Sequence, residues 1–388
     1  MCDKLQMIKC KNQLAKKEAK MKSTKKSILF SAYSLEIGGI ETALISLLNY
    51  LEKTNKYEIT LVLEKKQGEL LNKLNKNVKI IKYTPSYNKI FSKVINGCKR
   101  LKFTLKYKNK FDSSFAYATY CKMASATAQI ASKNSNLWVH SSYLDIFNNN
   151  RNKYKEFFEK LNVNNFKNII FVSNKSKNEF ETIMNRTNTI VCNNIIDYKK
   201  IEKLSQEKIE LNKTQEFTFL YIGRITEDSK KISRLLEAAK VLKNKNYEFR
   251  IIIIGNGKDF EKSQEYVKKN NLQNHIIFLG MKINPYPYYK ISDSLILVSE
   301  NEGYPVVYNE AKILNLPIIT TDVSDSRFDI ENKFGIVCKQ NLEDIIDKME
   351  YVIKNGFTPI IPKFEKFSAE QYNESIAQKI ENIINERN

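Results

Sequence analysis

The chain has 388 residues, of which 42% are hydrophobic, so it is long enough to form two domains with apolar cores rather than one. It carries a formal net charge of +21, and it contains no run of eighteen apolar residues and no apolar N-terminal centre, so we expect neither a transmembrane helix nor a signal peptide. Six cysteines are scattered without a Cys-x-x-Cys pair, which argues against a disulfide scaffold or zinc site and favours a reducing cytoplasm.

The first part of the chain begins with a basic arm and then alternates strand and helix patterns. Residues 1–26 hold nine lysines against two acids and are weakly periodic, so we expect a mobile or surface-bound helical arm. After it, short apolar runs predict strands, and longer segments with helical spacing predict helices. In chain order these are strand Ser27–Ala32, helix Glu41–Leu51, strands Glu58–Leu63, Val78–Ile81 and Ser113–Ala118, helix Met123–Ser132, and strands Leu137–Val139, Asn168–Val172 and Ile190–Cys192.

A second set of elements comes after the polar stretch 198–215, which we interpret as a linker. It shows the same alternation of short apolar runs and helical segments. In chain order these are strand Phe217–Ile222, helix 231–243, strand Phe249–Ile254, helix 258–269, strands Ile276–Leu279, Leu295–Val298 and Pro317–Thr320, and helices 341–353 and Ser368–Ile384.

Strands interleaved with helices are typical of parallel sheets covered on both faces, so we predict an α/β protein with two Rossmann-like, doubly wound domains. The predicted divisions are a basic arm (1–26), a first domain (27–197), the linker (198–215), a second domain (216–365) and a C-terminal helix (366–388). Because ligands of such sheets bind at the carboxyl ends of the strands, residues that come directly after a strand are candidates for a site.

The segment Ser299–Ala311, with the sequence SENEGYPVVYNEA, carries the most information. It follows a predicted buried strand, and Pro305 is expected to open a helix because proline favours the first helical position. Glu302 would then stand at the mouth of a cleft, and Glu310 would lie about 7–8 Å further along the helix axis. Free N–H groups at the helix start, together with the helix dipole, favour an anion. One phosphate site and two carboxylates that accept hydroxyl groups suit a nucleotide-activated sugar.

The spacing of Glu302 and Glu310 resembles the Glu-x7-Glu signature of the family 4 retaining glycosyltransferases, which have the two-domain GT-B fold. Four further segments resemble that family in the same order along the chain. They are SAYSLEIGGIETAL (Ser31–Leu44), the glycine-rich first loop; WVHSS (Trp138–Ser142), with the histidine of the first domain; FVSNKSKNEF followed by NNIID (Asn193–Asp197), the end of that domain; and YIGRITEDSKK (Tyr221–Lys231), the phosphate-binding element. The resemblance covers residues 27–385 and implies a C-terminal helix that crosses back to the first domain.

The resemblance implies that Arg224 and Lys230 bind the diphosphate of the donor. Cations in that place neutralise the charge that develops as the nucleotide leaves, without a metal. A one-residue insertion lies between them, and Lys231 stands where the family usually has glycine, so either lysine could reach the phosphate. The alternative is that these residues are solvated surface cations.

The same resemblance assigns Glu310 to the ribose hydroxyls and Glu302 to hydroxyls of the transferred sugar. Gly303 and Tyr304 would offer backbone N–H groups to the phosphates, and a glycine lets a ligand approach the backbone closely. The alternative is that both glutamates are exposed residues of a helix and a loop.

In the first domain, His140 ends a predicted strand close to the only tryptophan, Trp138. It occupies the place of the family's histidine near the donor sugar. Gly38 and Gly39 follow a strand and precede a helix, so their backbone could pass close to the diphosphate or the acceptor. The alternatives are a core histidine with satisfied hydrogen bonds and a simple tight turn.

No cluster of His, Cys, Asp or Glu has metal-ligand spacing, so we expect no metal and no cofactor. Asp322-Val-Ser-Asp325 is not the Asp-x-Asp motif of the other major transferase fold. Gly255-Asn256-Gly257 is interpreted as a turn near the nucleotide, and Asn284–Tyr288 as a segment near the base. The resemblance implies a reaction on one face of the sugar, in which the departing phosphate oxygen helps to deprotonate the acceptor hydroxyl.

Most of the positive charge lies in two stretches of the first half. Residues 1–26 have a net charge of +7 and residues 70–111 a net charge of +12, together +19 of the total +21. Within residues 89–110, apolar residues recur at helical spacing between lysines, as in an interfacial helix. We therefore predict that 1–26 and 89–110 bind an anionic membrane surface, as the family's lipid-acceptor enzymes do. The alternative is an ordinary surface helix, and the lack of a nucleic-acid-binding motif argues against a nucleic-acid partner.

Together these features predict a cytoplasmic glycosyltransferase, peripheral on the inner membrane face, that is retaining, metal-independent and of the hexosyltransferase type. It would move a sugar from a nucleotide-diphosphate donor, expected to be UDP-linked, to a lipid-linked or polysaccharide acceptor in capsule, lipopolysaccharide or teichoic acid synthesis. One alternative is a nucleotide-sugar epimerase or hydrolase of the same fold. Another is a non-catalytic, transferase-like membrane partner.

Overall fold

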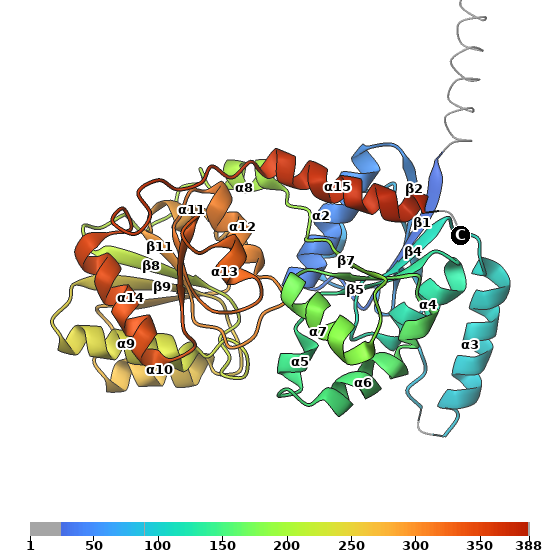
Figure 1. The fold of residues 1–388 in the computed structure, drawn as a ribbon, viewed down its shortest axis with the longest axis horizontal. Helices are drawn as coiled ribbons and strands as arrows, with labels where there is room; N and C mark the ends of the chain where they lie inside the picture. The colour runs from blue at the N-terminus through green and yellow to red at the C-terminus, as the bar shows by residue number, and fades with distance from the viewer. Residues whose placement is uncertain (1–24, 89, 387–388) are drawn as a thin grey trace, which may run out of the picture.

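Two lobes lie side by side in the computed structural model, which describes residues 25–88 and 90–386 (Figure 1). Each lobe is built around one parallel sheet with helices on both faces, so the predicted α/β fold with two Rossmann-like domains is confirmed. The prediction of a basic helical arm concerns residues 1–26, of which 1–24 lie outside the described residues.

The first lobe contains a seven-stranded parallel sheet with the order β3-β2-β1-β4-β5-β6-β7. Its strands are β1 (Lys26–Ala32), β2 (Tyr57–Leu63), β3 (Lys79–Lys82), β4 (Ser113–Ala116), β5 (Ser135–Val139), β6 (Asn168–Phe171) and β7 (Thr189–Val191). The helices around it are α2 (Gly39–Lys53), α3 (Ser92–Tyr107), α4 (Lys122–Ala131), α5 (Tyr143–Ile146), α6 (Arg151–Lys160) and α7 (Asn174–Met184), with short 3-10 turns η1 (Glu69–Lys73) and η2 (Val163–Asn165).

The second lobe contains a six-stranded parallel sheet with the order β10-β9-β8-β11-β12-β13. Its strands are β8 (Phe217–Ile222), β9 (Phe249–Ile254), β10 (Ile276–Gly280), β11 (Ser294–Leu297), β12 (Ile318–Thr321) and β13 (Gly335–Cys338). Its helices are α9 (Ile232–Asn244), α10 (Phe260–Lys269), α11 (Tyr286–Lys290), α12 (Val306–Ile313), α13 (Ser326–Asp329) and α14 (Leu342–Asn355), and α8 (Tyr198–Leu204) precedes this lobe in the chain.

Burial on both faces explains why these segments form parallel strands. Strand β9, with the sequence FRIIII, is buried along its whole length because helices cover both faces of the sheet. Its one charged residue, Arg250, donates to the carbonyl oxygen of Asn212 at 3.1 Å and to Thr218 Oγ1 at 3.2 Å. These acceptors satisfy the buried guanidinium and tie residue 212 to the second sheet.

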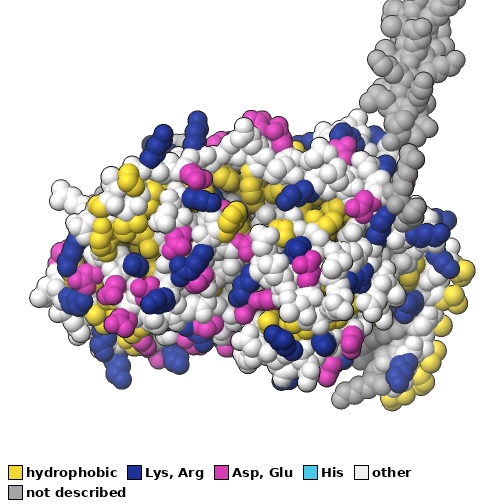
Figure 2. Space-filling view, in the orientation of Figure 1, with side chains coloured by type: hydrophobic (Ala, Val, Ile, Leu, Met, Phe, Trp, Pro, Cys, Tyr) yellow, Lys and Arg dark blue, Asp and Glu magenta, His cyan; other side chains and the backbone are white. Residues whose placement is uncertain are grey.

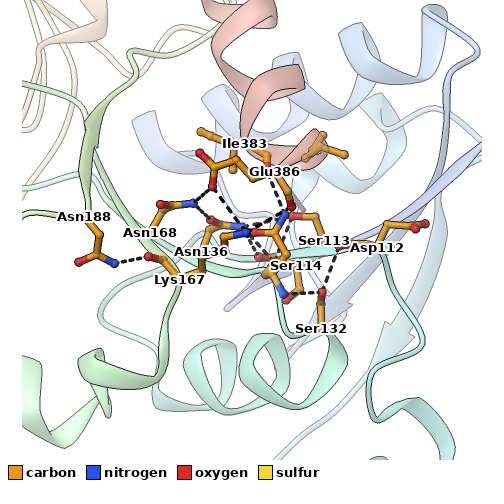
Figure 3. A network of polar contacts seen from close by, with 12 residues as sticks. Asp112, Ser113, Ser114, Ser132, Asn136, Lys167, Asn168, Asn188, Ile383 and Glu386 are labelled. Atoms are coloured by element: carbon orange, nitrogen blue, oxygen red, sulfur yellow. Dashed lines mark hydrogen bonds and ion pairs between the residues drawn. The ribbon is translucent and has the colours of Figure 1, made fainter. Parts of the chain in front are cut away.

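The last helix, α15 (Ala369–Asn385), leaves the second lobe and lies on the first (Figure 1). Figure 3 shows the polar contacts around the end of this helix, where Asn168 Nδ2 donates to a carboxylate oxygen of Glu386 at 2.9 Å. Four isoleucines at helical spacing belong to the core of the first lobe: Ile376, Ile380, Ile383 and Ile384. The predicted return of the C-terminal helix to the first domain is therefore confirmed.

The two points at which the chain passes between the lobes are joined to each other. Near the first passage, the backbone N–H of Ile196 donates to Asn373 Oδ1 at 2.9 Å, and Asn373 Nδ2 donates to the carbonyl oxygen of Ile196 at 2.7 Å. Asn373 lies on α15 and is buried, so its amide links the second passage to the first.

The strands and helices predicted in chain order between residues 27 and 384 are present, with ends that differ by two residues or fewer, and the helical segment predicted at 89–110 corresponds to α3, which is three residues shorter at each end. The elements that were not predicted include helices α5, α6, α7, α11 and α13 and strand β13. Helix α6 shows the reason, because its buried residues are only Tyr154 and Phe158. The predicted linker 198–215 is partly helical, since α8 lies within it and contacts α11 and α12. Pro305 caps α12 with an extended ψ of 118°, so the helix begins one residue later than predicted.

Candidate functional site

The strand order of the second sheet reverses between two neighbouring strands, β8 and β11, where Leu295 pairs with Leu220. In doubly wound sheets, ligands bind outside the carboxyl ends of the strands at this reversal. The loop after β8 carries Arg224, and the loop after β11 carries Glu302. Two segments that lie far apart in the sequence, and that the sequence analysis singled out separately, thus lie side by side.

Backbone contacts hold these loops together. The N–H of Glu300 donates to the carbonyl oxygen of Ser229 at 2.8 Å, which fixes the loop after β11 against the turn before α9. On the other side, a Cβ at Gly255 would lie 1.9 Å from the carbonyl oxygen of Gly223, and Gly255 has a φ of +147°. Glycine is therefore required at 255 so that the loop after β9 can support the loop after β8.

The three predicted phosphate-binding cations differ in their partners. Arg224 is exposed and Lys231 is half-buried, and within the described residues neither side chain makes an ion pair. Lys231 caps α9 with a φ of +48°, in the left-handed region that explains the family's glycine at this position. Lys230 instead forms an ion pair with Glu302.

Glu302 is held on one carboxylate oxygen by two groups of its own lobe. Ser299 Oγ donates to Glu302 Oε1 at 2.7 Å, and Lys230 Nζ donates to the same oxygen. The Glu302 side chain is 12% exposed. Its position is therefore fixed before any ligand arrives, and the pairing of Lys230 with Glu302 is a contact that the sequence did not predict.

Gly303 brings the two lobes into direct contact. A Cβ at this position would lie 1.9 Å from the carbonyl oxygen of His140 and 3.0 Å from the Cα of Ser141, both in the first lobe. Only a residue without a side chain allows this approach. The contact places the predicted histidine beside the Glu302–Gly303 turn, although the two segments are far apart in the sequence.

His140 is buried between aromatic rings at the end of β5. Its ring lies parallel to that of Trp138, with centroids 5.8 Å apart, and 4.3 Å from the ring centroid of Tyr117. Burial lowers the pKa of His140 to about 3, so the imidazole is neutral at physiological pH. Its Nε2 atom is buried and has no hydrogen-bond partner within the described residues. A buried polar atom without a partner is costly, and a ligand hydroxyl could satisfy it.

Glu310 lies on α12 and is bound by tyrosines of the preceding helix. Tyr289 donates its hydroxyl to Glu310 Oε2 at 2.6 Å. Burial raises the pKa of Glu310, and hydrogen bonds from Tyr289 and Tyr286 partly offset that rise. Tyr286 belongs to the segment 284–288 that we expected near the base, so its contact with Glu310 joins two predicted parts of the site.

The start of α12 leaves backbone donors free. Within the described residues, the N–H groups of Gly303, Tyr304, Val306 and Val307 donate to no protein acceptor. Such groups and the helix dipole favour an anion. The side chain of Tyr304 turns to another partner, because its hydroxyl donates to Asp329 at 2.5 Å, so only its backbone is available to a ligand.

The glycine loop of the first lobe lies against the same helix start. A Cβ at Gly39 would be 3.8 Å from Val306 Cγ2, an ordinary contact across the cleft. Gly38 precedes α2 with an extended φ of −164°, and a Cβ there would meet only the carboxylate of Glu41. Neither glycine has a strained backbone, and a Cβ at Gly38, 2.3 Å from Glu41 Oε2, would require that side chain to move.

A second contact between the lobes was not predicted from the sequence. The carboxylate of Asp325 accepts hydrogen bonds from the backbone N–H groups of Asn174 at 2.7 Å and Lys175 at 3.0 Å. A side chain of the second lobe thus caps helix α7 of the first lobe. Nearby, a polar cavity of about 310 Å³ opens between the lobes, with Asp145 and Glu300 in its walls. No local pattern reveals such a cap, because its partners are about 150 residues apart.

Two general features of the described residues bear on the site. No group of three or more His, Cys, Asp or Glu side chains is arranged to hold a metal ion in the part of the chain that the structure describes. Among its helices, none combines the length and apolar character needed to cross a bilayer.

Comparison with solved structures defines the class of fold. HepE of Anabaena, solved in complex with UDP and glucose, is 17% identical to this chain, with a TM-score of 0.70 over 92% of this chain and 99% of that chain. At this identity the likeness shows the fold alone, which is GT-B: two Rossmann-like lobes that face each other across a cleft.

Sequence comparison adds a likeness in the second half of the chain. Residues 202–386 match the model of glycosyl transferases group 1. An uncharacterized glycosyltransferase of Methanocaldococcus jannaschii is 32% identical over 180 residues, which are 45% of this chain and 42% of the relative. The lipopolysaccharide 1,6-galactosyltransferase of Escherichia coli K12 is 31% identical over 119 residues, 29% of this chain and 32% of the relative. The chain thus matches less than half the length of these curated relatives.

Proposed function

We propose that this protein is a retaining glycosyltransferase that moves a sugar from a nucleotide-diphosphate donor, by preference UDP-linked, to a lipid-linked or polysaccharide acceptor of the cell surface. One observation carries the proposal. Free cations, free backbone N–H groups and two fixed carboxylates meet at the strand-order reversal of the second sheet, directly opposite a buried histidine of the first lobe. The match to the family model, and the names of a galactosyltransferase relative and of a UDP complex, support it.

The diphosphate would lie between the loop after β8 and the start of α12. Arg224 and Lys231 have no protein counter-ion within the described residues, so both charges are available to phosphate. Lys230 would exchange its contact with Glu302 for the phosphate when the donor binds. Positive groups and N–H donors there stabilise the negative charge that develops on the leaving nucleotide.

The sugar and the ribose would use the carboxylates. Glu310, fixed by Tyr289, would accept the ribose hydroxyls, and Glu302, freed from Lys230, would accept hydroxyls of the transferred sugar. Because His140 is neutral and its Nε2 has no partner within the described residues, it would hydrogen-bond another hydroxyl of that sugar from the first lobe. In this scheme the second lobe (216–365) binds the donor and the first lobe (27–197) binds the acceptor.

The proposed chemical step takes place on one face of the sugar. The bond between the anomeric carbon and the phosphate oxygen breaks, and the acceptor hydroxyl oxygen forms the new bond from the same side. Its proton passes to the departing phosphate oxygen, so the products are the nucleoside diphosphate and a glycoside of retained configuration. The cations would carry the developing charge, so the proposed reaction is independent of a metal.

The membrane part of the proposal rests on α3, at the right edge of the first lobe (Figure 1). Figure 2 shows hydrophobic and basic side chains gathered over this edge. Apolar residues that project from this region include Ile90, Val94, Leu101 and Leu105, with exposed fractions of 81%, 67%, 59% and 77%. Exposed apolar residues among lysines suit a peripheral contact with an anionic, cytoplasmic membrane surface. Residues 1–26 would add charge to that contact.

A thermal-shift panel of UDP-, GDP-, ADP- and dTDP-sugars tests the donor. A ligand at a hundred times its Kd adds about 2.7 kcal/mol of stability, so the donor should stand out clearly. Arg224→Gln should abolish the shift, and Lys262→Gln, a matched exposed cation on α10, should not. If the protein binds a donor and hydrolyses or epimerises it without an acceptor, the result would favour a nucleotide-sugar hydrolase or epimerase. No shift with any nucleotide sugar would favour a non-catalytic partner.

A further inference from the structure

The first sheet has a reversal of strand order like that of the second. Strands β1 and β4 are neighbours, with Ile28 paired to Ser113, and the chain continues outward from them in both directions. The same topological rule that places a ligand at the end of β8 and β11 therefore marks a second crevice at the end of β1 and β4. The residues that come after these strands decide which ligands the crevice can bind.

Aromatic residues occupy that second crevice. Tyr33 follows β1 and Tyr120 follows β4, and their rings meet edge to face with centroids 6.2 Å apart. Tyr120 is 47% exposed, although it sits beside the buried Cys121. Tyr87, in the loop after β3, is 69% exposed. Three partly exposed phenol rings thus gather at the carboxyl edge of one sheet.

A buried carboxylate fixes one ring of this tyrosine cluster, that of Tyr87. Glu64 follows β2 and is 4% exposed. It accepts hydrogen bonds from the hydroxyl of Tyr87 and from Cys121 Sγ, the latter at 3.2 Å. Since both of its oxygens are engaged, Glu64 is an anchor for Tyr87 rather than a group that contacts a ligand. A platform whose rings are held in advance loses little entropy when a ligand binds.

The cluster reaches the proposed donor site through Glu41. The hydroxyl of Tyr120 donates to Glu41 Oε1 at 2.9 Å, and Glu41 lies in the first turn of α2, which begins at Gly39 beside Val306. Glu41 Oε2 accepts no hydrogen bond from the described residues, so it is free to accept one from a ligand. The rings therefore extend the cleft from the donor site into the first lobe.

We propose that Tyr33, Tyr120 and Glu41 form the subsite that binds the terminal saccharide of the acceptor. A sugar ring offers a weakly polar face of C–H groups, which packs on an aromatic ring, and edge hydroxyls, which donate to a carboxylate. A nucleotide or phosphate suits this place less well, because the carboxylate of Glu41 would repel it and a nearby cation, Lys65, already lies 4.9 Å from the ring centroid of Tyr33. The role as an acceptor subsite rests on the proposed function, whereas saccharide binding does not.

Saturation-transfer NMR with the whole chain tests the subsite. The probes are methyl α- and β-glycosides of glucose, galactose, mannose and N-acetylglucosamine, and the disaccharides lactose and maltose. At least one probe should receive saturation from the wild-type protein. Tyr120→Ala should weaken that binding by about tenfold, since the stacked ring is lost, whereas Tyr120→Phe keeps the ring and should retain most of it. Leu105→Ala, an exposed apolar residue on α3, is the remote control.

Two outcomes would overturn the subsite. In the first, no probe binds the wild-type protein. In the second, Tyr120→Ala and Tyr120→Phe both bind the probe as well as the wild type does. The thermal shift of each variant with UDP is measured in parallel. It should equal that of the wild type, which also establishes that Tyr120→Ala is folded. Absence of a UDP shift in all proteins would contradict the proposed function, and it would leave the saccharide result to be judged separately.

Discussion

The two lobes share one topology, and they differ in the residues at the carboxyl ends of their strands. At its reversal the second sheet carries cations, free backbone N–H groups and carboxylates, whereas the first carries tyrosines and a histidine kept neutral by burial. The net charge shows the opposite distribution: the cations of the candidate site belong to the second lobe, but two stretches of the first half hold +19 of the total +21. The cations that the structure describes within residues 70–111 are exposed, while the charges that could meet a diphosphate are few and belong to the nearly neutral second half.

The largest expected effect concerns the carboxylate of the second lobe. Glu302→Gln should lower turnover by about 10²–10³-fold, because it removes a charge-assisted contact with the transferred sugar. The affinity for UDP should change far less, since the nucleotide uses other groups. Steady-state kinetics and UDP titrations separate the two, with Glu156→Gln on the exposed face of α6 as control. An equal loss of UDP affinity would contradict the role given to Glu302.

The histidine of the first lobe should make stability depend on pH. Its folded pKa of about 3 lies below the ordinary value of 6.5, so the unfolded chain binds more protons between these values. Stability due to this group is complete above pH 6.5 and falls as the pH drops toward 3, by about 3 kcal/mol at pH 4. Thermal midpoints at pH 7 and pH 4 measure this. His140→Gln should flatten the dependence, and His275→Gln should keep it; equal slopes in both variants would rule out His140 as the cause.

The contact between the lobes is tested by a pair of glycine variants. Gly303→Ala forces a Cβ against the His140 carbonyl and should destabilise the protein by about 2 kcal/mol, with loss of activity. Gly97 on α3 has no atom within 4 Å of its added Cβ, so Gly97→Ala should instead stabilise by about 0.5–1 kcal/mol. Thermal unfolding compares them. If both variants shift the midpoint in the same direction, the close approach at 303 is wrong.

The cap across the cleft should control how the lobes sit together. Asp325→Ala removes the acceptor of two N–H groups on α7 and should cost about 1 kcal/mol. Asn341→Ala removes an equivalent cap within one lobe, where Asn341 accepts from the N–H of Asp344 at 2.8 Å. Small-angle scattering should show a larger radius of gyration for Asp325→Ala alone. Identical scattering of the two variants would mean that the cap does not hold the lobes.

The smallest effect is expected on the outer face of the first lobe. Lys102→Gln on α3 should weaken binding to vesicles that contain anionic lipid by about fivefold, since each such lysine contributes about 1 kcal/mol. Lys262→Gln on the second lobe should leave binding unchanged. Vesicle sedimentation measures both at low and physiological salt. Equal binding of the two variants would indicate that α3 is an ordinary surface helix.

The sequence predicted those parts of the fold and site that local patterns encode. Strand β9 is recognisable from its apolar run, and Arg224 and Glu302 each follow an apolar run closely, so the sequence places both in loops after strands. Elements with few apolar residues, such as α6 and α7, have no comparable signal. At several helix ends the chain uses asparagine in the left-handed region, for example Asn185 after α7, where a glycine would have marked the boundary.

Contacts between distant segments could not be predicted in the same way. The approach of Gly303 to His140 and the cap of α7 by Asp325 depend on how two separately folded sheets are placed, which no local pattern records. Likewise, the sequence assigned Lys230 to phosphate and Glu302 to sugar, and gave no sign that the two bind each other before the donor arrives. Tyr33 and Tyr120 are separated by more than eighty residues, and only the neighbouring positions of β1 and β4 bring them together.

The return of α15 to the first lobe has a consequence for synthesis. A ribosome makes the residues of the first sheet early, but the isoleucines that complete their apolar core belong to the last helix of the chain. During synthesis the core of the first lobe therefore stays incomplete, with part of its apolar surface uncovered, until the second lobe has been made and residue 385 has left the exit tunnel. The lobe that is synthesised first can complete its fold only after the last helix has been synthesised.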